Sequence, residues 1–83
     1  MNAFKGKRVH FNDDYLIVEL EDGRIISTPL DWYPELKKAT IEQIKNYHFI
    51  CRSTGIEWED LDYQLSIESM LIGENKSHHT AVA

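Results

Sequence analysis

The sequence predicts an α+β fold in which a small antiparallel sheet packs against two to three short helices. Three observations support this prediction. The first thirty residues alternate between apolar and polar side chains, which is the period of a β-strand. Helical spacing begins near Pro34, and a second alternating run covers residues 47–58. We therefore expect a three-stranded N-terminal meander and a second hairpin in a single domain of residues 1–73.

The meander is indicated by its apolar face and by its turns. The second strand carries an apolar row made of Leu16, Val18 and Leu20. The sequences NDD at residues 12–14 and EDG at residues 21–23 are typical of turns. Gly23 favours a type I′ turn, because the central residues of that turn need positive φ. Pro29 has no amide hydrogen to donate to a sheet, so it is expected to end the third strand.

Helical structure is expected after the third strand. Asp31 can cap a helix, and Pro34 suits a first helical turn, where its missing amide hydrogen is not needed. Thr40 can cap a following segment in which Ile41 and Ile44 share one face. The sequence leaves open whether these segments form two short helices or one kinked helix.

The second half of the chain predicts a hairpin and a closing helix. The apolar positions of the first hairpin strand are Tyr47, Phe49 and Cys51. The sequence STG at residues 53–55 is expected to form the turn. A helix is expected to begin at Leu65 or Ser66 and to end at Gly73. Its apolar face would carry Ile67, Met70 and Leu71. Residues 74–83 lack periodicity and are expected to form a disordered C-terminal tail.

Charge and composition indicate a cytoplasmic protein that binds a basic protein. The formal net charge is −5, and residues 57–74 contain no Lys or Arg. Their carboxylates belong to Glu57, Glu59, Asp60, Asp62, Glu68 and Glu74. An acidic surface repels nucleic-acid phosphate, so direct nucleic-acid binding is not expected. No segment has the composition of a secretion signal or membrane span, and the lone Cys51 fits a reducing compartment.

The sequence offers no positive sign of catalysis, of a cofactor or of a metal. Residues three apart on a strand point to opposite faces, so His48 and Cys51 are not expected to bind one ion. The pair His78–His79 lies in the expected tail. Cys51 is interpreted as a small core residue rather than a nucleophile. The glycines are not clustered, which argues against a phosphate-binding loop.

Between residues 8 and 73 the chain resembles the small bacterial proteins grouped as domain of unknown function 2442. The resemblance is carried by DGRIISTPLDWYPELKKATIEQIKNY and by GIEWEDLDYQLSIESMLIG. The matching positions are Trp32, Pro34, Leu36, Ala39, Gly55, Trp58, Leu61, Asp62, Leu71 and Gly73. Departures occur at Glu57, where the family usually has histidine, at Glu59, where it has proline, and after Asp62, where its acidic triplet is incomplete.

The resemblance implies a compact α+β domain and a non-enzymatic module. Some members are fused to a helix-turn-helix domain, and many are encoded beside a small partner, an arrangement similar to toxin–antitoxin pairs. Because the chain stops soon after the closing glycine of the family pattern, it is expected to be the bare module without a DNA-binding domain.

The sequence is compatible with three functions. The leading hypothesis is a non-enzymatic protein-binding module, antitoxin-like or inhibitor-like. Its interface is expected to contain Trp32, Tyr33, Glu57, Glu59 and Asp60. The alternative is a small-ligand sensor with a pocket near Trp32 and Trp58, and the second alternative is a phage- or mobile-element-encoded inhibitor of a nucleic-acid-binding complex. Trp58 is expected in the core because it alternates with Ile56, whereas Trp32 is left open between core and interface.

Overall fold

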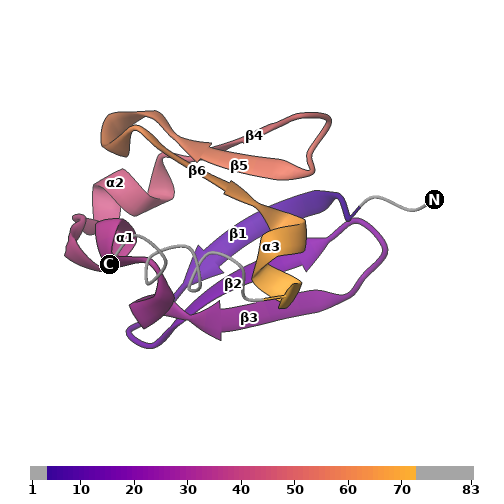
Figure 1. Cartoon of the computed structure of the whole chain (residues 1–83), viewed down its shortest axis with the longest axis horizontal. Coiled ribbons are helices and arrows are strands. Elements are labelled where there is room, and N and C mark those ends of the chain that lie inside the picture. Colours follow the sequence, from indigo (N-terminus) through magenta and orange to yellow (C-terminus); the bar gives the residue numbers. More distant parts are fainter. Residues whose placement is uncertain (1–3, 73–83) are drawn as a thin grey trace.

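The computed structural model describes residues 4–72, which form two three-stranded antiparallel sheets and three short α-helices (Figure 1). The elements in chain order are β1 (Gly6–Phe11), β2 (Tyr15–Leu20), β3 (Ile25–Pro29), the 3-10 turn η1 (Leu30–Trp32), α1 (Pro34–Lys38), α2 (Ile41–Lys45), β4 (His48–Ile50), β5 (Gly55–Trp58), the 3-10 turn η2 (Glu59–Leu61), β6 (Tyr63–Ser66) and α3 (Ile67–Ile72). The predicted α+β class and the N-terminal meander are confirmed. The C-terminal boundary at Gly73 and the expected tail at residues 74–83 lie outside the described residues.

The first sheet has the order β1-β2-β3 and buries one face, as its alternation predicts. Val18 lies opposite Val9 on one side and Ile26 on the other, so the three strands contribute to one apolar row. Thr28 of β3 also points inward and shares a buried hydrogen bond of 2.9 Å with the hydroxyl group of Tyr33. Pro29 ends β3, as expected.

The turn between β2 and β3 differs from the predicted type I′ turn. Gly23, with φ of 97°, is its only residue with positive φ, whereas a type I′ turn needs two. The amide of Gly23 donates to the carbonyl oxygen of Leu20 at 3.0 Å, and the amide of Leu20 donates to the carbonyl oxygen of Arg24 at 2.8 Å. The connection is therefore a three-residue loop in which glycine supplies the bulge.

The segment after β3 forms two separate helices, because Ala39 is extended, with ψ of 159°, between α1 and α2. Pro34 is at the start of α1, as predicted. The expected cap by Asp31 is wrong: Asp31 lies within η1, α1 has no side-chain cap, and the Asp31 carboxylate pairs with Lys37 instead.

The second helix begins with a complete capping box. The amide of Gln43 donates to the Thr40 hydroxyl oxygen at 3.1 Å, and the amide of Thr40 donates to the Gln43 side-chain oxygen at 3.0 Å. The expected cap at Thr40 is confirmed. The expected apolar pair is only half correct, because this five-residue helix buries Ile44 and leaves Ile41 63% exposed.

The second sheet has the order β4-β5-β6, and its third strand was not predicted. A helix was expected to begin at Leu65 or Ser66, but both residues belong to β6, and α3 begins at Ile67. Within α3, Ile67 and Met70 are buried as expected, whereas Leu71 is exposed. Leu65 packs into the core from β6, so the strand extends the buried face of the predicted hairpin.

The turn of the β4–β5 hairpin comes earlier than predicted. Three consecutive residues, Cys51, Arg52 and Ser53, have φ of 55°, 59° and 70°, and the turn includes Thr54. Gly55 belongs to β5 rather than to the turn. Cys51 is exposed, so its expected place in a core strand is wrong. The positive φ values reverse the chain before the alternation can carry Cys51 inward.

The hydrophobic core lies between the two sheets, and α1 and α2 close one end of it (Figure 1). Polar contacts also join the two halves. The Tyr47 hydroxyl group accepts a hydrogen bond from the amide of Val9 at 3.0 Å. The Ser53 carbonyl oxygen accepts from the amide of Gly6 at 2.7 Å. Within residues 4–72 no helix is both long enough and apolar enough to cross a membrane.

Candidate functional site

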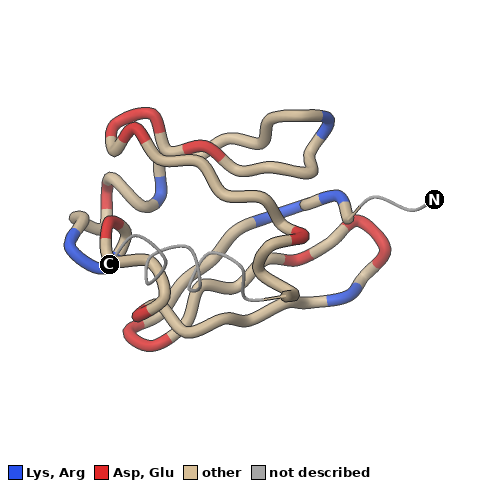
Figure 2. The backbone as a smooth tube through the Cα atoms, in the orientation of Figure 1, with Lys and Arg blue, Asp and Glu red and all other residues tan. Residues whose placement is uncertain are grey.

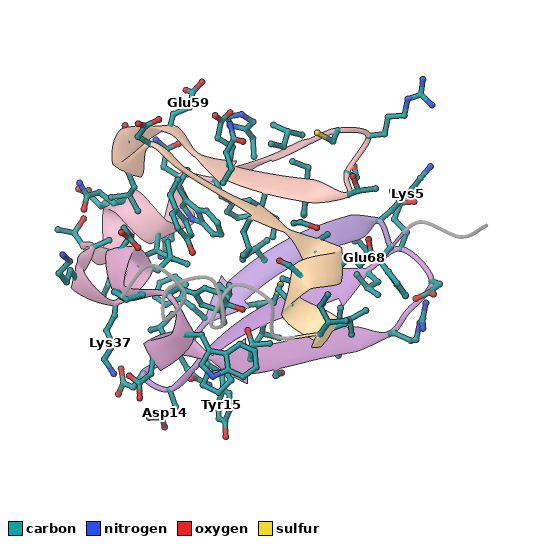
Figure 3. All side chains as sticks on the ribbon, viewed as in Figure 1. Lys5, Asp14, Tyr15, Lys37, Glu59 and Glu68 are labelled. Carbon is teal, nitrogen blue, oxygen red and sulfur yellow. The ribbon has the colours of Figure 1, made fainter. Side chains whose placement is uncertain are left out.

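Three carboxylates gather at one end of the second sheet. Glu57 is in β5, and Glu59 and Asp60 are in η2, directly after Trp58. Strand alternation directs the Trp58 indole into the core, where it is 0% exposed, and directs the Glu57 side chain to the opposite face. Figure 2 shows acidic residues concentrated at this end, and in Figure 3 Glu59 points away from the body of the molecule. We call Glu57, Glu59 and Asp60 the acidic patch.

Glu57 is held by its two cross-strand neighbours. His48 of β4 and Gln64 of β6 lie opposite Glu57, one on each side. The Gln64 amide nitrogen donates to Oε2 of Glu57 at 3.0 Å, and Nε2 of His48 lies 2.9 Å from Oε1. The hydrogen bond from Gln64, supported by that from His48, lowers the pKa of Glu57 below its ordinary value. The carboxylate is therefore both oriented and ionised at neutral pH.

Two hydrogen bonds with α2 and its C-terminal cap hold the segment that carries the acidic patch. The Trp58 indole nitrogen donates to the carbonyl oxygen of Ile44 at 2.8 Å, which joins β5 to α2. Asn46, at the C-terminal cap of α2, donates from its side chain to Oδ2 of Asp60 at 3.1 Å. Two contacts to the same helix thus fix the start of η2 and the Asp60 carboxylate.

Among residues 4–72, the acidic patch brings together three carboxylates, two of which, Glu59 and Asp60, have no ion-pair partner. Within residues 4–72, no Lys or Arg forms an ion pair with Glu57, Glu59 or Asp60, and the only ion pair of the patch is with His48. Elsewhere among residues 4–72, three carboxylates pair with Lys or Arg. These pairs are Arg8–Glu19, Arg24–Asp22 and Lys37–Asp31. The negative charge of the patch is therefore available to a second molecule.

The comparisons place this fold in a family. Residues 7–76, more than half of the chain, match the family described as "Protein of unknown function (DUF2442)". The chain belongs to the DUF2442 family. The chain is also similar to the crystal structure of a protein of unknown function from Rhodospirillum rubrum ATCC 11170. That comparison has a TM-score of 0.74 at 24% identity and covers 87% of this chain and 89% of the other, so it shows a common fold. No curated protein matches the chain.

In this DUF2442 chain, the aromatic residues expected at the interface do not join the acidic patch. Tyr33 is 0% exposed and its hydroxyl group bonds to Thr28, so its expected place on the surface is wrong. Trp32 is partly buried in η1 and packs against the core, with its ring centroid 6.4 Å from that of Tyr33. Figure 1 places residues 30–32 beside the end of β3, with α1 and α2 between them and residues 59–61.

His48 and Gln64 are the residues of the site that sequence reasoning missed. His48 was considered as a metal ligand only together with Cys51, and Cys51 lies in the exposed turn after β4. The structure instead brings His48 together with Glu57 and Glu59, whose possible ligand atoms all lie within 4.8 Å of one another. The hairpin register would have revealed the first contact, because His48 and Glu57 are cross-strand partners. Gln64 could not be found without β6.

Proposed function

We propose that this DUF2442 protein is a non-enzymatic protein-binding module whose acidic patch receives a basic partner, in the manner of an antitoxin or an inhibitor. The observation that carries the proposal is that Glu57, Glu59 and Asp60 lie together and pair with no Lys or Arg among residues 4–72. Carboxylates of this kind attract an oppositely charged surface and accelerate its encounter. Arg side chains of a partner could then pair with them in bidentate geometry.

The fixed position of the patch supports the same proposal. Asp60 is held by Asn46, and Glu57 is held by Gln64 and His48. A surface that is ordered before binding loses less conformational entropy on association than a mobile one. Glu59 is exposed and extends the charge beyond these two fixed carboxylates.

The two alternatives, a small-ligand sensor and an inhibitor of a nucleic-acid-binding complex, make different demands on the structure. A sensor with a pocket between the two tryptophans would need an accessible Trp58, and the Trp58 indole is enclosed by the core. An inhibitor of a nucleic-acid-binding complex would use the same acidic patch, with carboxylates in place of phosphates. Competition by duplex DNA for the captured partner separates this inhibitor from an antitoxin-like module.

The test is capture of a partner from a lysate of the native host with three versions of the full chain. The variant Glu59→Lys/Asp60→Lys reverses the patch. The matched control Asp13→Lys/Glu21→Lys makes the same change in net charge at exposed turns of the first sheet. We expect the unmodified chain and the control to retain one stoichiometric protein at low salt and to release it at high salt. Equal retention by the patch variant would exclude the acidic patch as the interface.

A further inference from the structure

We infer that His48, Glu57 and Glu59 form a binding site for a divalent first-row transition-metal ion such as Zn²⁺. One imidazole nitrogen and two carboxylate groups meet on the outer side of the second sheet, with their possible ligand atoms within 4.8 Å of one another. Among residues 4–72 this is the one group of three or more such side chains with that geometry. The inference does not depend on the proposed protein-binding function.

The positions of the three side chains follow from the strand pairing. His48 and Glu57 are cross-strand partners in β4 and β5, so their side chains emerge from the same face of the sheet. Nε2 of His48 lies 2.9 Å from Oε1 of Glu57, in a hydrogen bond that a bound ion would replace as the nitrogen gives up its proton. Glu59 joins them because η2 turns the chain directly after Trp58.

A small movement of Glu59 would complete the site. Ligands at about 2.0–2.2 Å from one ion lie roughly 3–3.5 Å apart, so the widest present separation has to shorten by roughly 1–2 Å. Glu59 is exposed and its carboxylate has no ion-pair partner among residues 4–72, so a change of rotamer suffices. His48 and Glu57 need to separate only slightly from their present 2.9 Å contact.

The hydrogen bond from Gln64 orients one of the ligands. Gln64 donates to Oε2 of Glu57, which leaves Oε1 directed toward His48. Outer contacts of this kind hold a metal-binding carboxylate in one orientation and raise the affinity of the site. The mixture of one nitrogen and two oxygen ligands suits Zn²⁺, Co²⁺, Ni²⁺ or Fe²⁺ better than Mg²⁺ or Ca²⁺, which prefer oxygen alone.

Three protein ligands leave part of the coordination sphere open. Structural zinc sites usually have four protein ligands, whereas sites that keep a position for water or another molecule have three. The exposed His48 and Glu59 side chains place that open side toward solvent. An ion bound there would also cancel the charge of the two carboxylates.

The test is calorimetric titration of the full chain with Zn²⁺ alone, followed by Mg²⁺ alone. All proteins carry His78→Gln and His79→Gln, which remove the adjacent imidazole pair of the sequence as a competing site. We expect one Zn²⁺ site per chain, no comparable heat with Mg²⁺, and a loss of affinity of at least about tenfold in His48→Gln, because the imidazole is the preferred ligand.

The matched control is His10→Gln. His10 pairs with Glu19 on the first sheet as His48 pairs with Glu57, but no third possible ligand joins them among residues 4–72. We expect this variant to retain full Zn²⁺ affinity. Equal losses in the two variants, no loss in either, or equal binding of Mg²⁺ would overturn the inference. Circular dichroism of each variant verifies that the fold is retained, since both substituted histidines are exposed.

Discussion

The indole nitrogen of Trp58 donates a 2.8 Å hydrogen bond to the backbone carbonyl oxygen of Ile44. This bond joins the central strand of the second sheet to the helix that precedes it in the chain, and both groups are buried. It therefore sets the position from which η2 and the acidic patch begin. The stability of the domain and the geometry of its candidate site depend on the same side chain.

Trp58→Phe is expected to lower the free energy of unfolding by about 2–4 kcal/mol, because it leaves the Ile44 carbonyl group unpaired and opens space in the core. Urea unfolding followed by circular dichroism measures the change. Ile41→Ala is the control on the same helix, and its exposed side chain predicts a change within about 0.5 kcal/mol. Similar changes in the two variants would contradict an anchoring role for Trp58.

The capping box of α2 predicts a smaller effect. Thr40→Ala removes the hydroxyl group that accepts from Gln43 and is expected to cost about 1 kcal/mol. Thr40→Ser keeps the acceptor and should remain within about 0.5 kcal/mol of the unmodified chain. Urea unfolding of the two variants checks this order. A serine variant as unstable as the alanine variant would show that the Thr40 methyl group, rather than the cap, supplies the stability.

The close approach of β1 to the second sheet predicts that Gly6 cannot be replaced without cost. A methyl group at Gly6 would lie 2.3 Å from Cε1 of Phe49 and 3.0 Å from Cδ1 of Ile67. Gly6→Ala is expected to destabilise the fold by about 1–3 kcal/mol through overpacking. In a Phe49→Leu background the same substitution should cost less, because the nearest atoms are gone. An unchanged cost in that double variant would locate the strain elsewhere.

Tyr63 predicts a loss of stability at alkaline pH. Burial, followed by the Glu35 carboxylate and Tyr33, raises the pKa of Tyr63 from 10.0 to about 12. The unfolded chain therefore loses this proton first, and the free energy of unfolding falls as the pH rises from about 10 to about 12. Tyr63→Phe should lack this component. Unfolding curves of both chains at about pH 9 and about pH 11.5 measure it, and equal losses would contradict the assignment to Tyr63.

Alternation was sufficient to predict the first sheet, and the core position of Trp58 follows from its place two residues after Ile56. The β4–β5 turn was expected at residues 53–55, and its exact position could not be predicted, because Cys51, Arg52 and Ser53 adopt positive φ, which such residues rarely do. Contacts from distant parts of the chain stabilise that turn: the Ser53 carbonyl oxygen accepts from Gly6, and the Thr54 carbonyl oxygen accepts from Ile67. Tertiary structure rather than local preference decides its position.

The candidate site was predicted only in part for a related reason. The acidic residues at 57, 59 and 60 lie within four positions of the sequence, so their proximity needed no knowledge of the fold. Tyr33 was expected at the interface beside Trp32, and its bond to Thr28 was not visible in the sequence. The contacts of His48 and Gln64 with Glu57 depend on strand register, and β6 itself was missed.

The most direct test of the central claim is the rate of association between the purified chain and its captured partner, followed by stopped-flow fluorescence at increasing salt. If the acidic patch receives a basic surface, Glu59→Lys/Asp60→Lys should slow association at low salt by about tenfold or more and flatten its salt dependence. Asp13→Lys/Glu21→Lys should retain most of both the rate and the salt dependence. Identical rates and salt dependence for the patch variant and the unmodified chain would contradict the account.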